Sequence, residues 1–443
     1  MYTFSKRLKI VSILLFVVGA IGWGTSYVAS HGLTLEDVKT LLAEENSHHG
    51  AKASHSEETT ETAHHDVQTD AEAHSAMTHS TLDSDAHDED SHADDAHHDD
   101  SHAEHVLHQM HNRPYAALYI AAFFFFMISL GVLAFYAIQY AAQAGWSPVL
   151  FRVMEAITYY VLPGGLIVLG IAFWADDHIF IWMDPEVVAH DALIQAKSGW
   201  LDKTWFTIRG LIFITGWSLY RYFSRKFSLA QDLADVNDNS NFKKNFRISA
   251  GFLVFYIYTE SMMSWDWIMS VDPHWFSTLF GWYVFASMFV SGITVIALMT
   301  IYLKSKGLMD FVNDSHLHDL AKFMFAISVF WTYLWFSQFM LIWYANIPEE
   351  VTYFVTRIED YNLPFFGMII LNFIFPFLVL MNSDYKRVPW FIVMAGVVIL
   401  FGHYIDVFNM IMPATVGDRW FIGVPEISAI LLFLGLFIFI VFY

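Results

Sequence analysis

Residues 114–140 read PYAALYIAAFFFFMISLGVLAFYAIQY, a continuous apolar stretch that contains no charged residue. A helix of about 20 apolar residues is long enough to cross the hydrocarbon core of a bilayer. Similar stretches recur along the chain, at roughly 9–29, 149–174, 203–223, 247–271, 275–303, 320–345, 350–381, 388–411 and 422–443. The sequence therefore predicts an all-α integral membrane protein with about ten transmembrane helices.

The composition agrees with a membrane protein. Of the 443 residues, 56% are hydrophobic and only 15% are charged, whereas about a quarter are charged in an ordinary soluble domain. The formal net charge of -21 is concentrated between residues 44 and 111, so it gives no indication of a nucleic-acid partner. Cysteine is absent, which excludes structural disulfides, covalently attached haem and iron–sulfur ligation by this chain.

The lysines and arginines predict the orientation of the helices, because cytoplasmic loops are enriched in these residues. Basic residues gather before the first apolar stretch and in alternate loops, around 6–9, 221–247, 304–322 and 386–387. We therefore expect both termini in the cytoplasm and the loop 175–202 on the outer face.

The first stretch begins like a secretory signal, but its apolar region exceeds the usual length of about 7–15 residues. We expect residues 1–30 to form an uncleaved first helix, while the Val-Ala-Ser sequence at 28–30 leaves cleavage open.

Residues 31–112 form an insert that is rich in His, Asp, Glu, Ala, Ser and Thr from about residue 45 onward. This composition buries too little apolar surface to offset the entropy of ordering the chain, so we expect disorder on the outer face. The histidines suggest a tract that binds zinc or copper ions. No ligand spacing recurs regularly, which favours a solvated spacer.

Ionisable residues inside the predicted helices are the candidates for function, because a charge at that depth is costly and needs a partner or a task. The candidate proton carriers are Glu155, Glu260, Asp266, Asp360, His403 and Asp406. Glu155 lies near the inner surface and Glu260 near the middle of the membrane. Asp266 and Asp406 lie nearer the outer surface, so the set samples the whole depth, as a proton relay requires.

His403 and Asp406 are three residues apart, so they share one face of the ninth predicted helix. A carboxylate beside an imidazole raises its basicity and fixes its tautomer. The pair therefore suits contact with a quinol hydroxyl or a proton exit to the outer water. The alternative is a buried pair that orders a helix interface.

Two further sets of charges have a structural interpretation beside the functional one. Arg152 and Glu155 are three residues apart and predict a local ion pair at the level of the lipid headgroups. Arg357 and Asp360 have the same spacing, and we expect them to pair near the outer end of the eighth predicted helix.

The histidine pattern limits the redox chemistry of the chain. His403 is the single histidine well inside a predicted helix, so the paired axial ligands of a transmembrane cytochrome b are not available. No glycine-rich nucleotide-binding loop is evident. The chemistry must therefore involve protons, a quinone or the cofactors of a neighbouring subunit.

Two long runs resemble those of a known family. They are FSQFMLIWYANIPEE at 336–350 and SWDWIMSVDPHWFST at 264–278, and the segment SRKFSLAQD at 224–232 also matches. Together they resemble the NrfD-like (polysulfide reductase membrane subunit) family in the form found in bacterial alternative complex III. The histidine-rich insert is similar to that of the F-type subunits of this complex.

The resemblance implies two four-helix bundles, residues 113–271 (spans two to five) and 272–411 (spans six to nine), flanked by the first helix and by a tenth helix in 412–443. It also implies a multi-pass subunit of the bacterial inner membrane with its insert on the periplasmic face. This subunit would bind no cofactor and would not be catalytic alone.

The expected partners are a paralogous NrfD-like subunit with the quinol pocket, an iron–sulfur subunit and c-type cytochrome subunits. Such a complex oxidises menaquinol or ubiquinol and passes electrons to a cytochrome c or a terminal oxidase. The resemblance implies a proton path in this chain, and it makes quinone contact at His403 and Asp406 the weaker prediction.

Two other functions stay open at this point. A secondary transporter for a metal or another cation could be supplied by the histidine-rich outer tract, but it predicts several ligands at mid-membrane depth, and only Glu260 clearly meets that depth. A scaffold subunit would use its charges as satisfied pairs, and neutral replacements would then leave turnover and proton coupling unchanged.

Overall fold

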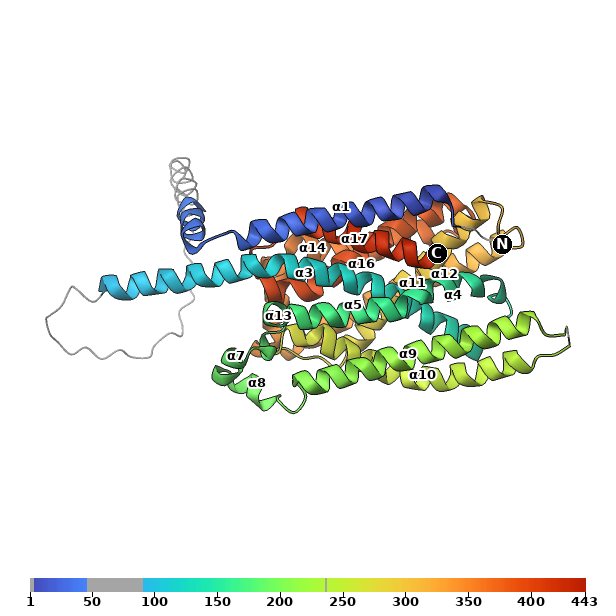
Figure 1. Ribbon diagram of the computed structural model, residues 1–443, viewed down its shortest axis with the longest axis horizontal. Helices are drawn as coiled ribbons and strands as arrows, with labels where there is room; N and C mark the ends of the chain where they lie inside the picture. The colour runs from blue at the N-terminus through green and yellow to red at the C-terminus, as the bar shows by residue number, and fades with distance from the viewer. Residues whose placement is uncertain (1–3, 46–90, 236) are drawn as a thin grey trace, which may run out of the picture. The chain divides into compact units, whose positions relative to one another are not determined.

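The computed structural model describes residues 4–45, 91–235 and 237–443, and within these ranges all regular structure is helical (Figure 1). Eight helical stretches are long and apolar enough to cross a membrane: Lys6–His31 (α1), Asp100–Ala141 within α3 (Ser91–Ala141), Pro148–Trp174, Phe280–Ser305 (α11), Asp314–Ala345 (α12), Asn362–Leu380, Pro389–Val416 (α16) and Val424–Phe442 (α17). The prediction of an all-α integral membrane protein is therefore confirmed.

Two more long helices occupy the predicted spans 203–223 and 247–271. Helix α9 (Lys203–Asp232) has 30 residues and helix α10 (Ser240–Trp267) has 28. Both are long enough to cross a bilayer, but they carry charges such as Arg209 and Asp266 and are not among the eight most apolar stretches. The predicted count of about ten helices thus combines eight apolar stretches with two more polar ones.

The predicted span 350–381 is wrong in its boundaries. An amphipathic helix, α13 (Pro348–Glu359), ends first, and the apolar stretch begins at Asn362 with α14 (Asn362–Ile369). A single π-helical turn at Ile370–Ile374 (η5) then leads into α15 (Phe375–Leu380). Pro376 explains the wide turn, because its ring would collide with the carbonyl of residue 372 in a regular α-helix.

The chain divides into two compact units, residues 1–28 with 111–443 and residues 29–110. In the second unit, residues 35–45 and the first part of α3 are helical and share a small apolar cluster around Val38, Ala103 and Val106. The predicted disorder is therefore wrong for 91–112, because alanine favours a helix there and a few apolar side chains find partners. Residues 46–90 of the insert, with most of its expected metal-binding tract, lie outside the described residues.

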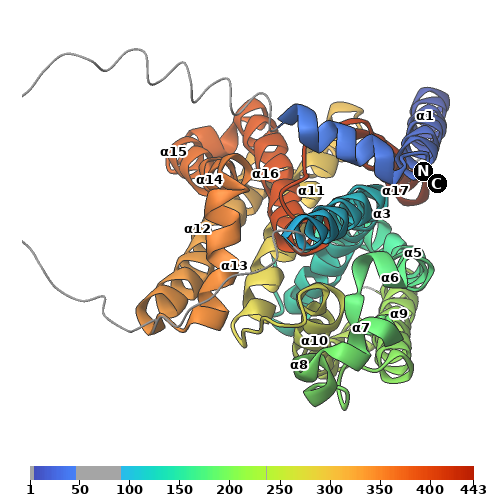
Figure 2. The same cartoon turned by 90° about the vertical axis from the view of Figure 1, so that its left-hand side faces the viewer.

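The helices of the larger unit pack in two groups (Figure 2). Helix α9 contacts α10 and α5 (Val161–Trp174), whereas α11 contacts α12 and α16. The expected division between residues 271 and 272 falls between α10 and α11. These helices also pack against each other, so both groups belong to one compact unit.

Glycines allow the closest contacts between helices. A Cβ atom on Gly131 of α3 would lie 2.1 Å from the carbonyl oxygen of Met288 in α11, and one on Gly292 would lie 2.8 Å from the nitrogen of Val132. Helices α1 and α17 meet in the same way through Gly19 and Gly435. Backbones touch directly at these points, as is common between membrane helices.

Both chain ends lie at the same end of the helices. The ring of Phe4 stacks on that of Phe442, with centroids 6.5 Å apart. The short helices α7 (Pro185–His190), α8 (Ala192–Ala196) and α13 lie at the opposite end (Figure 1). An even number of crossings fits this arrangement.

Candidate functional site

Asp406 is the centre of a buried hydrogen-bond cluster contributed by three helices. Its carboxylate in α16 accepts hydrogen bonds from the hydroxyl of Tyr283 in α11, from Ser287 Oγ at 2.9 Å and from Trp331 Nε1 of α12 at 2.9 Å. Asp406 has no exposed surface. Three donors stabilise a buried carboxylate without a direct cation, because each donated bond offsets part of its lost hydration.

His403 joins this cluster one turn earlier in α16. Its Nδ1 atom lies 2.8 Å from Ser287 Oγ and 3.5 Å from Asp406 Oδ2. The single hydroxyl proton of Ser287 is directed to Asp406, so Nδ1–H of His403 must donate to Ser287 Oγ. His403 Nε2 then carries a lone pair, and it has no hydrogen-bond partner among the described residues. The three side chains form the relay His403–Ser287–Asp406.

Buried polar side chains from α16, α13 and the π-helical turn lie around this relay, and we call this set the polar column. Its members are Asn372, His403, Asp406, Asn409 and Arg357, each at most 3% exposed. Asn372 lies on the π-helical turn, where a Cβ atom on Gly402 would be 2.1 Å from its Oδ1. Both side-chain polar atoms of Asn372 and Asn409 Oδ1 have no partner among the described residues. Buried polar atoms without a protein partner are uncommon and call for an explanation.

A small cavity adjoins the polar column between Tyr283 and Arg357. It holds about 10 Å³, and Gln338 and Asn409 also line it. This volume corresponds to roughly one water molecule, whereas ligand pockets are usually about 300–1,000 Å³. Neither His403 nor Asp406 lines this cavity, so their predicted quinone contact stays a prediction.

Arg357 in α13 is the last member of the polar column, and its contacts differ from the predicted ion pair with Asp360. Its guanidinium donates to the backbone oxygens of Asn409 at 2.9 Å and Tyr353 at 2.8 Å. The expected ion pair with Asp360 is wrong, because these carbonyls hold the guanidinium inside. Asp360 is exposed just beyond α13, where its backbone oxygen accepts a bond from Trp420. The predicted carrier Asp360 is thus not part of the polar column.

Glu260 is the one predicted carrier in the group of α9 and α10 without an ion pair. It is 3% exposed, its Oε1 has no partner among the described residues, and Ser261 Oγ lies 3.5 Å from Oε2. Its depth follows from the antiparallel packing of α10 and α11. Ser261 meets Gly281 and Tyr256 bonds to the sulfur of Met288, so Glu260 lies at the level of Tyr283 and the relay.

Asp266 lies further along α10 in a closed ion pair. Arg209 of α9 donates to both carboxylate oxygens, at 2.6 and 2.9 Å, and Trp200 Nε1 donates at 2.8 Å. The carboxylate has no exposed surface, and the Arg209 side chain is 14% exposed. Bidentate geometry of this kind satisfies both charges, so a structural role accounts for Asp266.

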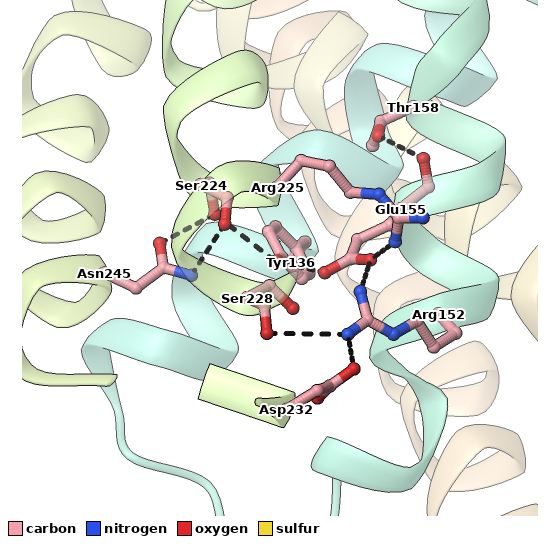
Figure 3. Close-up of polar contacts among 9 residues, drawn as sticks. All are labelled: Tyr136, Arg152, Glu155, Thr158, Ser224, Arg225, Ser228, Asp232 and Asn245. Carbon is pink, nitrogen blue, oxygen red and sulfur yellow. Dashed lines mark hydrogen bonds and ion pairs between the residues drawn. The ribbon is translucent and has the colours of Figure 1, made fainter. Parts of the chain in front are cut away.

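Glu155 also sits in a closed cluster (Figure 3). It belongs to α4 (Phe151–Ile157), which lies toward the end of the helices that holds the chain termini (Figure 1). Its carboxylate contacts Arg152 and Arg225 and accepts a 2.9 Å bond from Tyr136. Arg152 reaches Asp232 as well. The local pair of Arg152 and Glu155 that the sequence predicts is present, and a second arginine from α9 joins it.

The structure therefore brings His403 and Asp406 together, sets Glu260 at the same depth on a neighbouring helix, and keeps Glu155, Asp266 and Asp360 apart. The sequence reasoning missed Tyr283, Ser287, Trp331, Asn372 and Asn409. A signal for the first two was available, because 283, 287 and 291 are polar positions four residues apart in an otherwise apolar span.

Among the described residues, no group of three or more His, Asp or Glu side chains could hold a metal ion. Neither the comparison with protein-family models nor that with curated proteins finds a match for this chain.

Proposed function

We propose that this chain is a cofactor-free membrane subunit of a quinol-oxidising respiratory complex of the alternative complex III type, and that its polar column carries protons. The observation that supports the proton role is the relay His403–Ser287–Asp406, fully buried and flanked by polar atoms without partners. Ionisable groups inside a membrane protein are costly and mark proton relays. The respiratory assignment rests on the sequence runs at 264–278 and 336–350.

The remaining parts of the proposal concern the surroundings of the chain. The paralogous NrfD-like subunit would oxidise menaquinol or ubiquinol, and iron–sulfur and c-type cytochrome subunits would carry the electrons onward to a cytochrome c or a terminal oxidase. The complex would lie in the bacterial inner membrane. The basic loops support cytoplasmic termini and a periplasmic position for the insert.

The relay moves a proton in three linked steps. A proton that binds His403 Nε2 creates an imidazolium, whose Nδ1–H proton passes to Ser287 Oγ. Ser287 gives its own proton to Asp406 Oδ2 in the same movement, which leaves a neutral carboxyl and a neutral imidazole protonated on Nε2. Asp406 can then release its proton toward Tyr283 and the small cavity. The imidazole must return to its Nδ1–H tautomer before the next proton arrives.

The test is quinol oxidation with simultaneous proton release, measured in membrane vesicles that carry the intact complex. Asp406→Asn keeps the size of the side chain but cannot accept a proton, so quinol turnover should continue while protons beyond those from quinol disappear. Asp360→Asn is the matched control, because Asp360 is exposed and lies outside the polar column. Unchanged proton release in Asp406→Asn would leave the scaffold interpretation.

The partners are tested separately by gentle purification. Copurifying haem c and iron–sulfur absorbance is the expected result. A chain that purifies as a lone oligomer with tightly bound zinc would contradict the respiratory assignment and support the cation transporter.

A further inference from the structure

A second cavity lies far from the polar column, where α3 ends and α10 begins. It has a volume of about 510 Å³ and is lined by Gln143, Asn239, Phe242, Lys243, Phe246 and Arg247. This is the size of an ordinary ligand pocket. The lining combines polar and cationic side chains with two phenyl rings.

The walls of this cavity are held by specific contacts. The chain leaves α3 through Gln143, which adopts a left-handed conformation with φ of 50°. The ring of Tyr140 at the end of α3 lies 5.4 Å from that of Phe242. The backbone nitrogen of Phe242 donates a 2.9 Å bond to Gln231 Oε1 of α9. The lining residues come from the end of α3 and the start of α10, and the bond to Gln231 ties this part of α10 to α9.

The cavity has an excess of positive charge. Lys243 and Arg247 are four residues apart and share one face of α10. Both are exposed, and neither has a carboxylate within ion-pair distance among the described residues. Asp238 is a nearby acid whose Oδ1 accepts a 2.8 Å hydrogen bond from the Ser240 nitrogen, and its single charge is smaller than that of the two cations. Hydrogen bonds from Ser240, aided by the charges of Lys244 and Lys243, lower the pKa of Asp238.

The position of the cavity defines the ligand further. It opens at the ends of two membrane helices, on the side where the termini lie and where the sequence predicts the cytoplasmic leaflet. Basic pockets between membrane helices on this side attract anionic lipid headgroups. A free phosphate ion would use the two cations but not the phenyl rings, whereas a phospholipid uses both.

We propose that this cavity binds an anionic phospholipid, with its phosphate between Lys243 and Arg247 and the first part of its acyl chains against Phe242 and Phe246. Gln143 and Asn239 offer amide groups to the glycerol or headgroup oxygens. The inference does not depend on the proton path, because none of its residues belongs to the polar column.

The experiment uses the purified intact complex, stripped of lipid in detergent and titrated with phosphatidylglycerol or phosphatidylcholine, with bound lipid counted by native mass spectrometry. The test variant is Lys243→Gln with Arg247→Gln. The matched control is Lys226→Gln with Lys244→Gln, which removes the same charge from the same helix pair outside the cavity.

Phosphatidylglycerol should bind the wild type and the control alike, and phosphatidylcholine should bind both weakly. The test variant should lose roughly thirtyfold in affinity for phosphatidylglycerol, since each basic residue near the surface contributes about a factor of five. Equal affinity in the test variant, or equal binding of phosphatidylcholine, would overturn the proposal. Displacement of the lipid by millimolar inorganic phosphate would also overturn it and indicate a site for small anions.

Discussion

The hydroxyl of Ser287 lies 2.9 Å from the carboxylate of Asp406 and bridges it to His403, which is on the same helix as Asp406. Ser287 belongs to α11 and Asp406 to α16. Within the part of the chain that the structure describes, the Ser287 hydroxyl is the hydrogen-bonding group at normal distance from His403 Nδ1. Removing one oxygen atom should therefore interrupt the relay while leaving its charged group in place.

We expect Ser287→Ala to lower proton release per quinol while quinol turnover continues, because Nδ1–H of His403 loses its acceptor. Ser287→Thr retains the hydroxyl and should restore most of the coupling. Ser291→Ala is the control, since Ser291 Oγ bonds only to the backbone oxygen of Ser287. The measurement is proton release in vesicles with the intact complex, and equal coupling in Ser287→Ala and wild type would argue against the relay.

Glu260→Gln tests whether the first group of helices supplies the relay. Glu260 lies at the depth of Tyr283 without an ion pair, so the neutral amide should fold normally and show an unchanged melting temperature. If the carboxyl delivers protons, coupling falls and quinol turnover persists. If turnover and coupling both stay at the wild-type level, Glu260 is a structural carboxyl.

Arg209→Gln should destabilise the protein strongly, because Asp266 would be left buried without its cation. Breaking a buried ion pair at one partner costs about 3–5 kcal/mol, so thermal unfolding should shift to clearly lower temperature. Adding Asp266→Asn should recover much of the loss. Lys203→Gln, which breaks the more exposed pair with Asp176, should cost less than about 1 kcal/mol, and a similar loss in both single variants would contradict this account.

Asp191 should make the loop at 185–201 sensitive to acid. The backbone N–H of Ile194, with further help from His274, lowers the pKa of Asp191 below its ordinary value of 3.8. The carboxylate therefore stabilises the loop at pH values above 3.8, and this contribution is lost as the pH falls through the folded-state pKa. Pepsin cleavage within 185–201, measured between about pH 4 and pH 2, should rise more steeply in wild type than in Asp191→Asn. Parallel curves would show that this carboxylate does not hold the loop.

Gly131→Ala should destabilise the larger unit, because the new methyl group would meet the carbonyl oxygen of Met288 at 2.1 Å. Overpacking of a close contact costs typically about 1–3 kcal/mol. Gly170→Ala provides the control, since a Cβ atom there has nothing within 4 Å and alanine favours a helix. A melting temperature that is the same for both variants would show that α3 and α11 can move apart freely.

The apolar periodicity was sufficient to predict the membrane helices, because a span of about 20 apolar residues has few other stable states. It failed at 350–381, where the polar residues of α13 required a separate interfacial helix and Pro376 required a π-helical turn. The polar composition led to the second error, at 91–112, where disorder was expected but packing against Val38 gives the segment a small apolar cluster. The second error comes from a tertiary contact that a single sequence does not display, whereas the polar residues of α13 and Pro376 are visible in the sequence itself.

The candidate site could be predicted only in part. The spacing of His403 and Asp406 was sufficient to place them on one face. Their partners Tyr283 and Trp331 come from other helices, and no local pattern in one helix gives its register against another. The pairing of Asp266 with Arg209 depends in the same way on the alignment of α9 and α10.

The backbone contact between Gly131 and Met288 has a mechanical consequence. Alternating-access transporters expose a central site by rocking one bundle against the other, and such a motion must open the seam between the bundles. Here the backbones of α3 and α11 are in direct contact at Gly131 and again at Gly292, so no side chains separate the two helices at these points. Close backbone contacts of this kind oppose sliding of α3 against α11. The direction of proton transfer through the proposed path would then be set by small motions. These are the rotation of hydroxyl groups, the exchange of imidazole tautomers and the movement of single water molecules, rather than the displacement of whole helices.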